Sequence, residues 1–141
     1  MATRADFTDD EWRVLQLAVS DTMAWLTMAD PGFWDMFREA RGAATFISSV
    51  KATSESPLVR QLADDMKMKR DKALSANPTD MASEVIARVG DAAAIVAGKA
   101  PDDLPAFREF IVGVARATAE AAGGVGSTEA SAIAKLEAAL G

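Results

Sequence analysis

Two aspartates stand where the hydrophobic pattern makes a charged side chain unexpected, and they are the leading candidates for chemistry in this chain. Asp21 falls on an apolar stripe beside Trp25, and Asp30 opens the turn that follows. A buried carboxylate needs a positive partner or a proton, so such a residue can bind a divalent cation or act as an acid in a cleft. For Asp21 the alternatives are the edge of the surface or an ion pair with an arginine such as Arg38 or Arg41. For Asp30 the alternative is a helix cap.

A second candidate site is a group of aromatic and methionine side chains around the same turn. Its members are Trp25, Met28, Phe33, Trp34, Met36 and Phe37. Core packing is one interpretation of such residues at helical spacing. However, Phe33 and Trp34 are adjacent and cannot both point the same way. The group therefore also predicts a partner-binding face, with Trp25, Phe33, Trp34 and Phe37 as its residues.

The residues that the chain lacks narrow the chemistry further. It contains no Cys, His or Tyr. Thiol nucleophiles, disulfides, imidazole acid/base catalysis and metal sites built on Cys or His are therefore excluded. We predict a non-enzymatic protein without a cofactor, with a bound divalent cation as the open alternative. An enzyme that works with carboxylates alone is a further alternative.

Composition and charge limit the partners. The 141 residues carry a formal net charge of −6 and fit one domain, residues 1–141. An acidic chain has no electrostatic footprint for nucleic acid or for an anionic membrane surface. We find no apolar run near the ~18 residues of a membrane span and no apolar region typical of a signal peptide. We therefore expect a cytoplasmic protein that binds a protein partner or a second copy of itself.

The elements that would position the candidate residues are predicted to be helices. Residues 9–29 carry two apolar stripes at a spacing of about 100° per residue. The first stripe consists of Trp12, Leu15, Val19, Met23 and Leu26. The second stripe contains Val14, Leu17, Trp25 and Met28. A helix that is apolar on two sides packs between neighbours, so this segment is predicted to be the central helix of a bundle.

Capping signals mark where this and later helices begin. Thr8 and Glu11 have the spacing of a capping box, and Phe7 precedes them as a hydrophobic staple. Ser56 followed by Pro57 predicts the start of a third helix.

The remaining breaks divide the chain into about six helices without a strand. Asp102 or Asp103 is expected to cap the fifth helix, and Gly42 leaves open whether the second helix is continuous. The predicted fold is all-α, a compact single-domain bundle around the helix at residues 9–29.

The C-terminal part contains a recognisable hairpin pattern. An Ala-rich helix ends at Ala122, and Gly124, Ser127 and Glu129 follow at set spacing. With this pattern, residues 107–140 resemble the TerB-like family, named after a tellurite-resistance protein. Gly123 stands where that family has its turn aspartate. The resemblance implies an all-helical accessory protein of a stress response, and an acidic, metal-responsive site that would here depend on Asp30.

Two functions from different classes follow from these observations. The leading hypothesis is a non-enzymatic TerB-like accessory or protein-interaction module that docks through the aromatic group around residues 25–37. The alternative is a module that responds to a divalent cation or small ligand through Asp21 and Asp30. Tight, saturable binding of such a ligand would favour the second hypothesis over the first.

Overall fold

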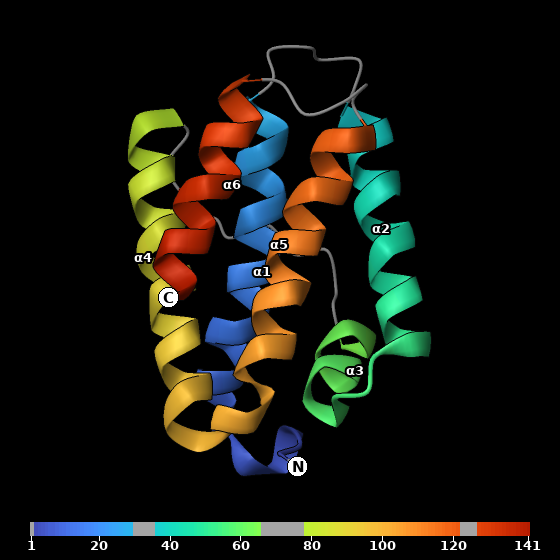
Figure 1. Cartoon of the computed structure of the whole chain (residues 1–141), viewed down its shortest axis with the longest axis vertical. Helices are drawn as coiled ribbons and strands as arrows, with labels where there is room; N and C mark the ends of the chain where they lie inside the picture. The colour runs from blue at the N-terminus through green and yellow to red at the C-terminus, as the bar shows by residue number, and fades with distance from the viewer. Residues whose placement is uncertain (1, 30–35, 66–77, 122–126) are drawn as a thin grey trace.

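A computed structural model describes residues 2–29, 36–65, 78–121 and 127–141 (Figure 1). The helices are α1 (Asp9–Ala29), α2 (Met36–Thr53), α3 (Pro57–Asp64), α4 (Pro78–Lys99), α5 (Leu104–Ala121) and α6 (Ser127–Leu140), with 3-10 turns η1 (Arg4–Asp6) and η3 (Pro101–Asp103). No strand occurs in these described ranges. The predicted all-α class and the number of helices are confirmed. α2 is continuous, so Gly42 does not break it.

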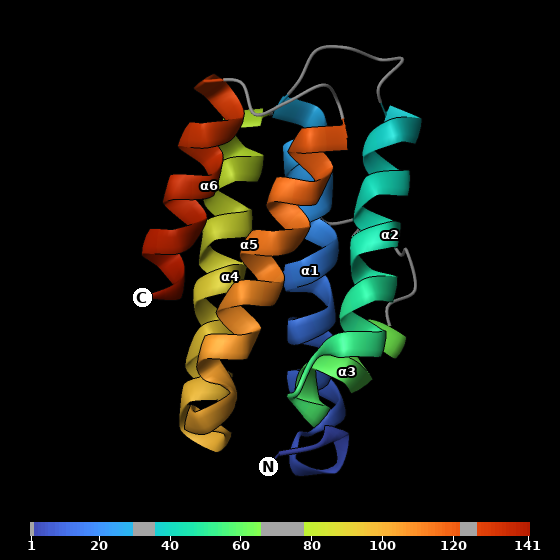
Figure 2. The same ribbon diagram turned by 45° about the vertical axis from the view of Figure 1, so that its right-hand side comes forward.

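α1 lies in the middle of the bundle, as its two apolar stripes predicted. It packs against α2, α4, α5 and α6, with α4 and α6 on one side and α2 and α3 on the other (Figures 1 and 2). All five members of the first stripe are buried. The second stripe is mixed, because Trp25 is buried whereas Val14 and Leu17 are half-buried.

α5 shares the central position, which the sequence pattern did not predict. It packs against α1, α2, α3, α4 and α6. Its buried residues are Phe107, Phe110, Ile111, Val114, Ala115, Thr118 and Ala119. The core is therefore built around two helices, α1 and α5, and both of them contact α2, α4 and α6 (Figure 2).

The predicted starts of α1 and α3 are confirmed by their capping hydrogen bonds. The backbone N–H of Thr8 donates to Glu11 Oε1 at 2.8 Å, and the N–H of Glu11 donates to Thr8 Oγ1 at 3.1 Å. Ser56 Oγ accepts from the N–H of Val59 at 3.3 Å. Local sequence was sufficient here because each cap involves residues within one turn of each other.

The predicted capping role of Asp102 or Asp103 is wrong. Asp103 is buried, at 2 % exposed. Its carboxylate accepts hydrogen bonds from Ser56 Oγ at 2.9 Å and from the N–H of Ala2 at 3.3 Å. These contacts tie the start of α3 to the turn before α5. A buried carboxylate requires hydrogen-bond donors, and tertiary contacts supply them here in place of the helix end.

Candidate functional site

Asp21 is buried, with 1 % of the residue exposed, so it does not lie at the edge of the surface, which was one of the alternatives. Its carboxylate forms an ion pair with the guanidinium of Arg88, from α4. The predicted partners Arg38 and Arg41 belong to α2, in a part of that helix whose side chains lie outside the description. The arginine that binds Asp21 comes from α4 because α4 packs along α1.

This ion pair changes what Asp21 can do. A carboxylate already bound by a guanidinium has its charge compensated, so a metal ion would have to displace Arg88. In the described ranges, no three acidic side chains gather closely enough to hold a metal ion. Asp30 lies outside the described residues. The cation-binding role of Asp21 and Asp30 stays a prediction.

The aromatic group around residues 25–37 is only partly within the description. Trp25 is 6 % exposed and belongs to the core. The expectation that its ring forms part of a partner-binding face is therefore wrong, because α1 turns this side of its second stripe inward. Phe33 and Trp34 lie outside the described residues, as does the side chain of Phe37.

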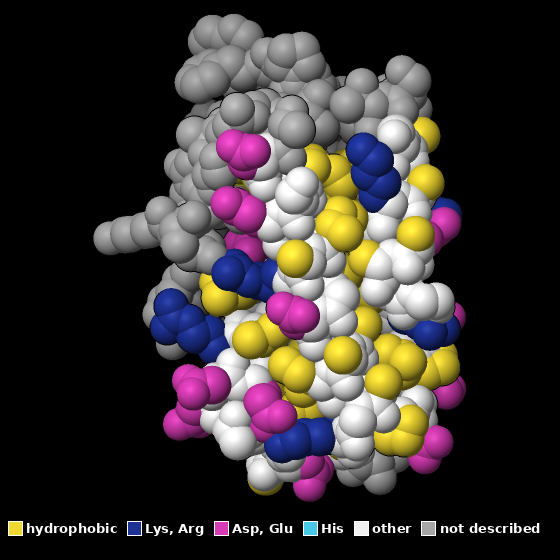
Figure 3. All heavy atoms as spheres, turned by 90° about the vertical axis from the view of Figure 1, so that its left-hand side faces the viewer, with side chains coloured by type: hydrophobic (Ala, Val, Ile, Leu, Met, Phe, Trp, Pro, Cys, Tyr) yellow, Lys and Arg dark blue, Asp and Glu magenta, His cyan; other side chains and the backbone are white. Residues whose placement is uncertain are grey.

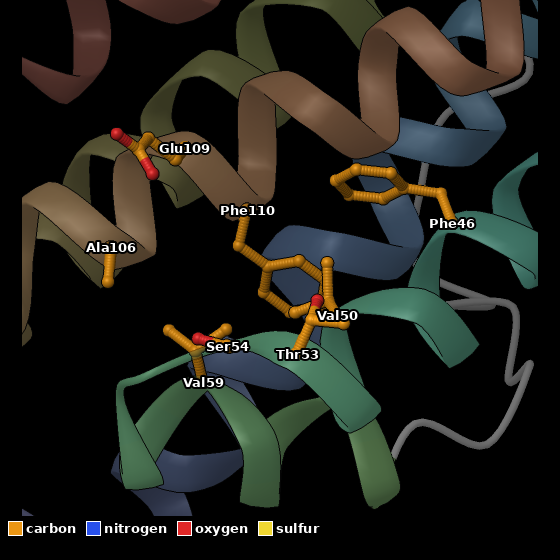
Figure 4. Close-up of a pocket in the computed structure, with 8 residues that line it drawn as sticks. All are labelled: Phe46, Val50, Thr53, Ser54, Val59, Ala106, Glu109 and Phe110. Atoms are coloured by element: carbon orange, nitrogen blue, oxygen red, sulfur yellow. The ribbon is translucent and has the colours of Figure 1, made fainter.

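A different surface has the shape of a binding site. It is an open groove of about 200 Å³ between α2, α3 and α5. The residues that line it are Phe46, Val50, Thr53, Ser54, Val59, Ala106, Glu109 and Phe110 (Figure 4). Most of these side chains are apolar, and they come from segments that are far apart in the sequence.

Close packing of α2 on α5 forms one end of this groove. The rings of Phe46 and Phe110 are stacked, with centroids 6.5 Å apart and planes at 26°. A Cβ atom at Gly113 would collide with the Phe46 ring, so the glycine leaves room for this ring to lie against α5. Gly113 thereby positions Phe46 as a wall of the groove.

The polar side chains of the groove differ in whether they form hydrogen bonds within the protein. Thr53 Oγ1 donates to the carbonyl oxygen of Ser49 at 2.7 Å, and Ser54 Oγ accepts from the N–H of Ser56 at 3.3 Å. Glu109 is exposed at the rim on the α5 side (Figure 4). Its carboxylate has no hydrogen bond or ion pair to any described residue. Glu109 is thus a charged group available to a ligand.

The described lining of the groove contains few groups that could take part in chemistry. The lining contains one carboxylate and two engaged hydroxyls, with no base beside a nucleophile. Its volume is below the roughly 300–1,000 Å³ that is common for small-molecule sites. A groove of this size and character fits one large apolar side chain of a partner.

Sequence reasoning missed this site because its residues belong to three helices and the link between two of them. One signal was present. Phe46 lies off the apolar stripe that Ala44, Ile47 and Val50 form on α2. An aromatic residue beside the buried stripe of a helix is either buried as well or has a role at the surface. Here the ring of Phe46 packs against Gly113 of α5.

The face of the bundle made by α4 and α6 differs from the groove. Figure 3 shows apolar side chains there in a band between charged residues. The exposed apolar residues of these helices include Ala87, Ala94, Ala97, Ala134 and Ala138. Short methyl side chains offer little area for an inserted anchor residue.

No protein-family model, curated protein or solved structure matches this chain. Within the described part of the chain, none of the helices combines the length and apolar character needed to cross a membrane.

Proposed function

We propose that this protein is a non-enzymatic interaction module that binds a segment of a partner protein in the groove between α2, α3 and α5. The groove itself is the observation that carries this proposal. The partner inserts one large apolar side chain against Phe46, Val50 and Phe110. Burial of such a side chain contributes about 1.5–3 kcal/mol, so a single anchor in a short peptide gives a weak affinity, with a dissociation constant of roughly 6–80 mM.

Three further points support the interaction role. The lining lacks the side chains of a catalytic centre, and the volume suits one side chain better than a metabolite. The resemblance to TerB-like proteins adds the expectation of an accessory protein in a stress response. The cation-responsive alternative has less support, because Asp21 is bound by Arg88.

The test uses short Gly/Ser peptides that carry one central Leu, Met, Phe or Trp, titrated into the nitrogen-labelled full chain and followed by amide NMR. We expect saturable shifts of amide signals from Phe46, Val50, Val59 and Phe110. A peptide with central Ala should leave the spectrum unchanged, because it buries too little apolar area in the groove.

A blocking variant and a matched control sharpen this test. Ala106→Phe adds a ring to the lining of the groove and should abolish the shifts. Ala94→Phe adds the same ring to an exposed position on α4, away from the groove, and should leave them intact. Binding that survives Ala106→Phe, or that no apolar peptide shows, would exclude the groove as the docking site.

A further inference from the structure

We infer that the segment bound in the groove carries a lysine or arginine next to its apolar anchor residue, and that Glu109 binds this cation. The inference rests on the proposed function, since it names the chemistry of the partner at the same groove. Its basis is the position of one exposed carboxylate on an otherwise uncharged lining.

Among the described residues that line the groove, Glu109 is the only charged one. It makes no hydrogen bond or ion pair within the described part of the chain. A cation that settles beside it therefore has no internal partner to displace.

Two basic residues that are neighbours of lining residues along the chain are engaged elsewhere, and a third, Arg60, which follows Val59 on α3, is exposed. Lys51, which follows Val50 on α2, forms an ion pair with Asp64 at 2.6 Å. Arg108, which precedes Glu109 on α5, donates to the carbonyl oxygen of Leu140 on α6 at 2.9 Å. Neither side chain compensates the charge of Glu109. The net charge of −6 adds a long-range attraction for a basic segment.

α5 offers a matched control for this carboxylate. Glu120 is also exposed and has no hydrogen bond or ion pair to a described residue. It lies about three turns further along the helix, roughly 16 Å away, and it does not line the groove. Glu109→Lys and Glu120→Lys change the net charge of the protein equally, but only the first changes the charge at the groove.

The experiment compares three versions of the apolar peptide that binds most tightly in the series above, with the anchor flanked by Lys, Gln or Glu. Dissociation constants are measured by amide NMR for the unchanged protein and for Glu109→Gln, Glu109→Lys and Glu120→Lys. For the unchanged protein we expect the Lys-flanked peptide to bind about two- to fivefold more tightly than the Gln-flanked peptide. The Glu-flanked peptide should bind more weakly than both.

The variants then assign this preference to one side chain. Glu109→Gln should remove most of the gap between the Lys- and Gln-flanked peptides, and Glu109→Lys should reverse the order of the Lys- and Glu-flanked peptides. Glu120→Lys should keep the original order. Added salt should reduce the difference in dissociation constant between the Lys- and Gln-flanked peptides, because salt screens an ion pair at the exposed rim.

The outcomes separate this inference from the proposed function. Apolar peptides that bind equally well whatever their flanking charge would overturn the inference and leave the groove as a docking site. A preference that Glu120→Lys weakens as much as Glu109→Lys would also overturn it, because net charge would then be the cause. If no apolar peptide binds, both proposals fail.

Discussion

The contact between α1 and α4 and the contact between α2 and α5 are built in different ways. Two ion pairs join α1 to α4, the buried Asp21–Arg88 pair and the more exposed Glu11–Lys99 pair. The contact between α2 and α5 depends on shape, because the Phe46 ring stacks on Phe110 and lies against the bare backbone of Gly113.

This difference explains where the protein has room for a partner. A charged pair holds two helices at one register, since a buried charge that loses its partner is costly. A contact between apolar side chains is held by close packing alone, without a fixed partner atom. Such a contact can therefore stop part-way along two helices. Beside this contact, Val50 of α2 and Ala106 of α5 line the groove.

The largest expected effect comes from breaking the buried ion pair between α1 and α4. Arg88→Met leaves the Asp21 carboxylate in the core without its guanidinium and should lower the free energy of unfolding by about 3 kcal/mol. Asp21→Asn should cost less, because the Arg88 side chain is 30 % exposed and can turn to water. Urea denaturation measures both. Arg13→Met, which removes an exposed arginine from α1, is the control and should have little effect.

Removal of the hydrogen bonds that hold α3 beside α5 should have the next largest effect. Ser56→Ala deletes the cap of α3 and one donor to the buried Asp103 carboxylate. We expect a loss of about 2 kcal/mol in the free energy of unfolding. Ser56→Thr keeps the hydroxyl and should therefore lose less of the free energy of unfolding than Ser56→Ala. Equal losses in the two variants would show that the hydroxyl does not hold α3 in place.

Gly113→Ala tests the shape-dependent contact between α2 and α5. The added methyl group collides with the Phe46 ring, at a cost of about 2 kcal/mol, while alanine favours the helix by about 1 kcal/mol. A net loss of about 1 kcal/mol is expected. In a Phe46→Ala background the same change should become stabilising, because the collision is gone. A double-mutant cycle by urea denaturation would show this reversal, and additive effects would contradict the packing described here.

The smallest effect is expected at the exposed Glu11–Lys99 pair, through pH. The hydrogen bond from Lys99 lowers the pKa of Glu11 below its ordinary value of 4.5, and the backbone hydrogen bond of Thr8 adds to this. Because the folded state holds the carboxylate charged, Glu11 contributes stability above pH 4.5 that is lost as the pH falls through its lowered pKa.

The measurement is the stability difference between the unchanged protein and Glu11→Gln as a function of pH. This difference should be constant near neutral pH and should shrink on acidification below about pH 4.5. In a Lys99→Met background, the stability difference caused by Glu11→Gln should change less with pH in the same range. A difference that grows on acidification would contradict the sign of the pKa shift.

Much of the fold was predictable because helices are specified locally. The capping box at Thr8 and Glu11 and the Ser56–Pro57 start of α3 involve neighbours within one turn, and both are confirmed. The buried stripe of α1 follows from its spacing alone. Asp103 could not be assigned in this way, because its donors are Ser56 and Ala2, which are remote in the chain.

The candidate site was less predictable for the same reason. The aromatic group at residues 25–37 is concentrated in the sequence and drew the docking prediction, yet Trp25 is in the core. The groove collects residues from three helices and one link, and none of them stands out locally except Phe46. Local density of aromatic residues indicates apolar surface to be buried, and tertiary packing decides whether that surface meets the core or a partner.

The sequence by itself determined the helices, the capped starts of α1 and α3 and the absence of thiol and imidazole side chains, since these depend on composition and on neighbours along the chain. Only the tertiary structure decided that Arg88, 67 positions away, binds Asp21, that α5 shares the centre with α1, and that Glu109 lies at the rim of an apolar groove. These features depend on how separate helices meet, and many pairings satisfy the same periodic patterns.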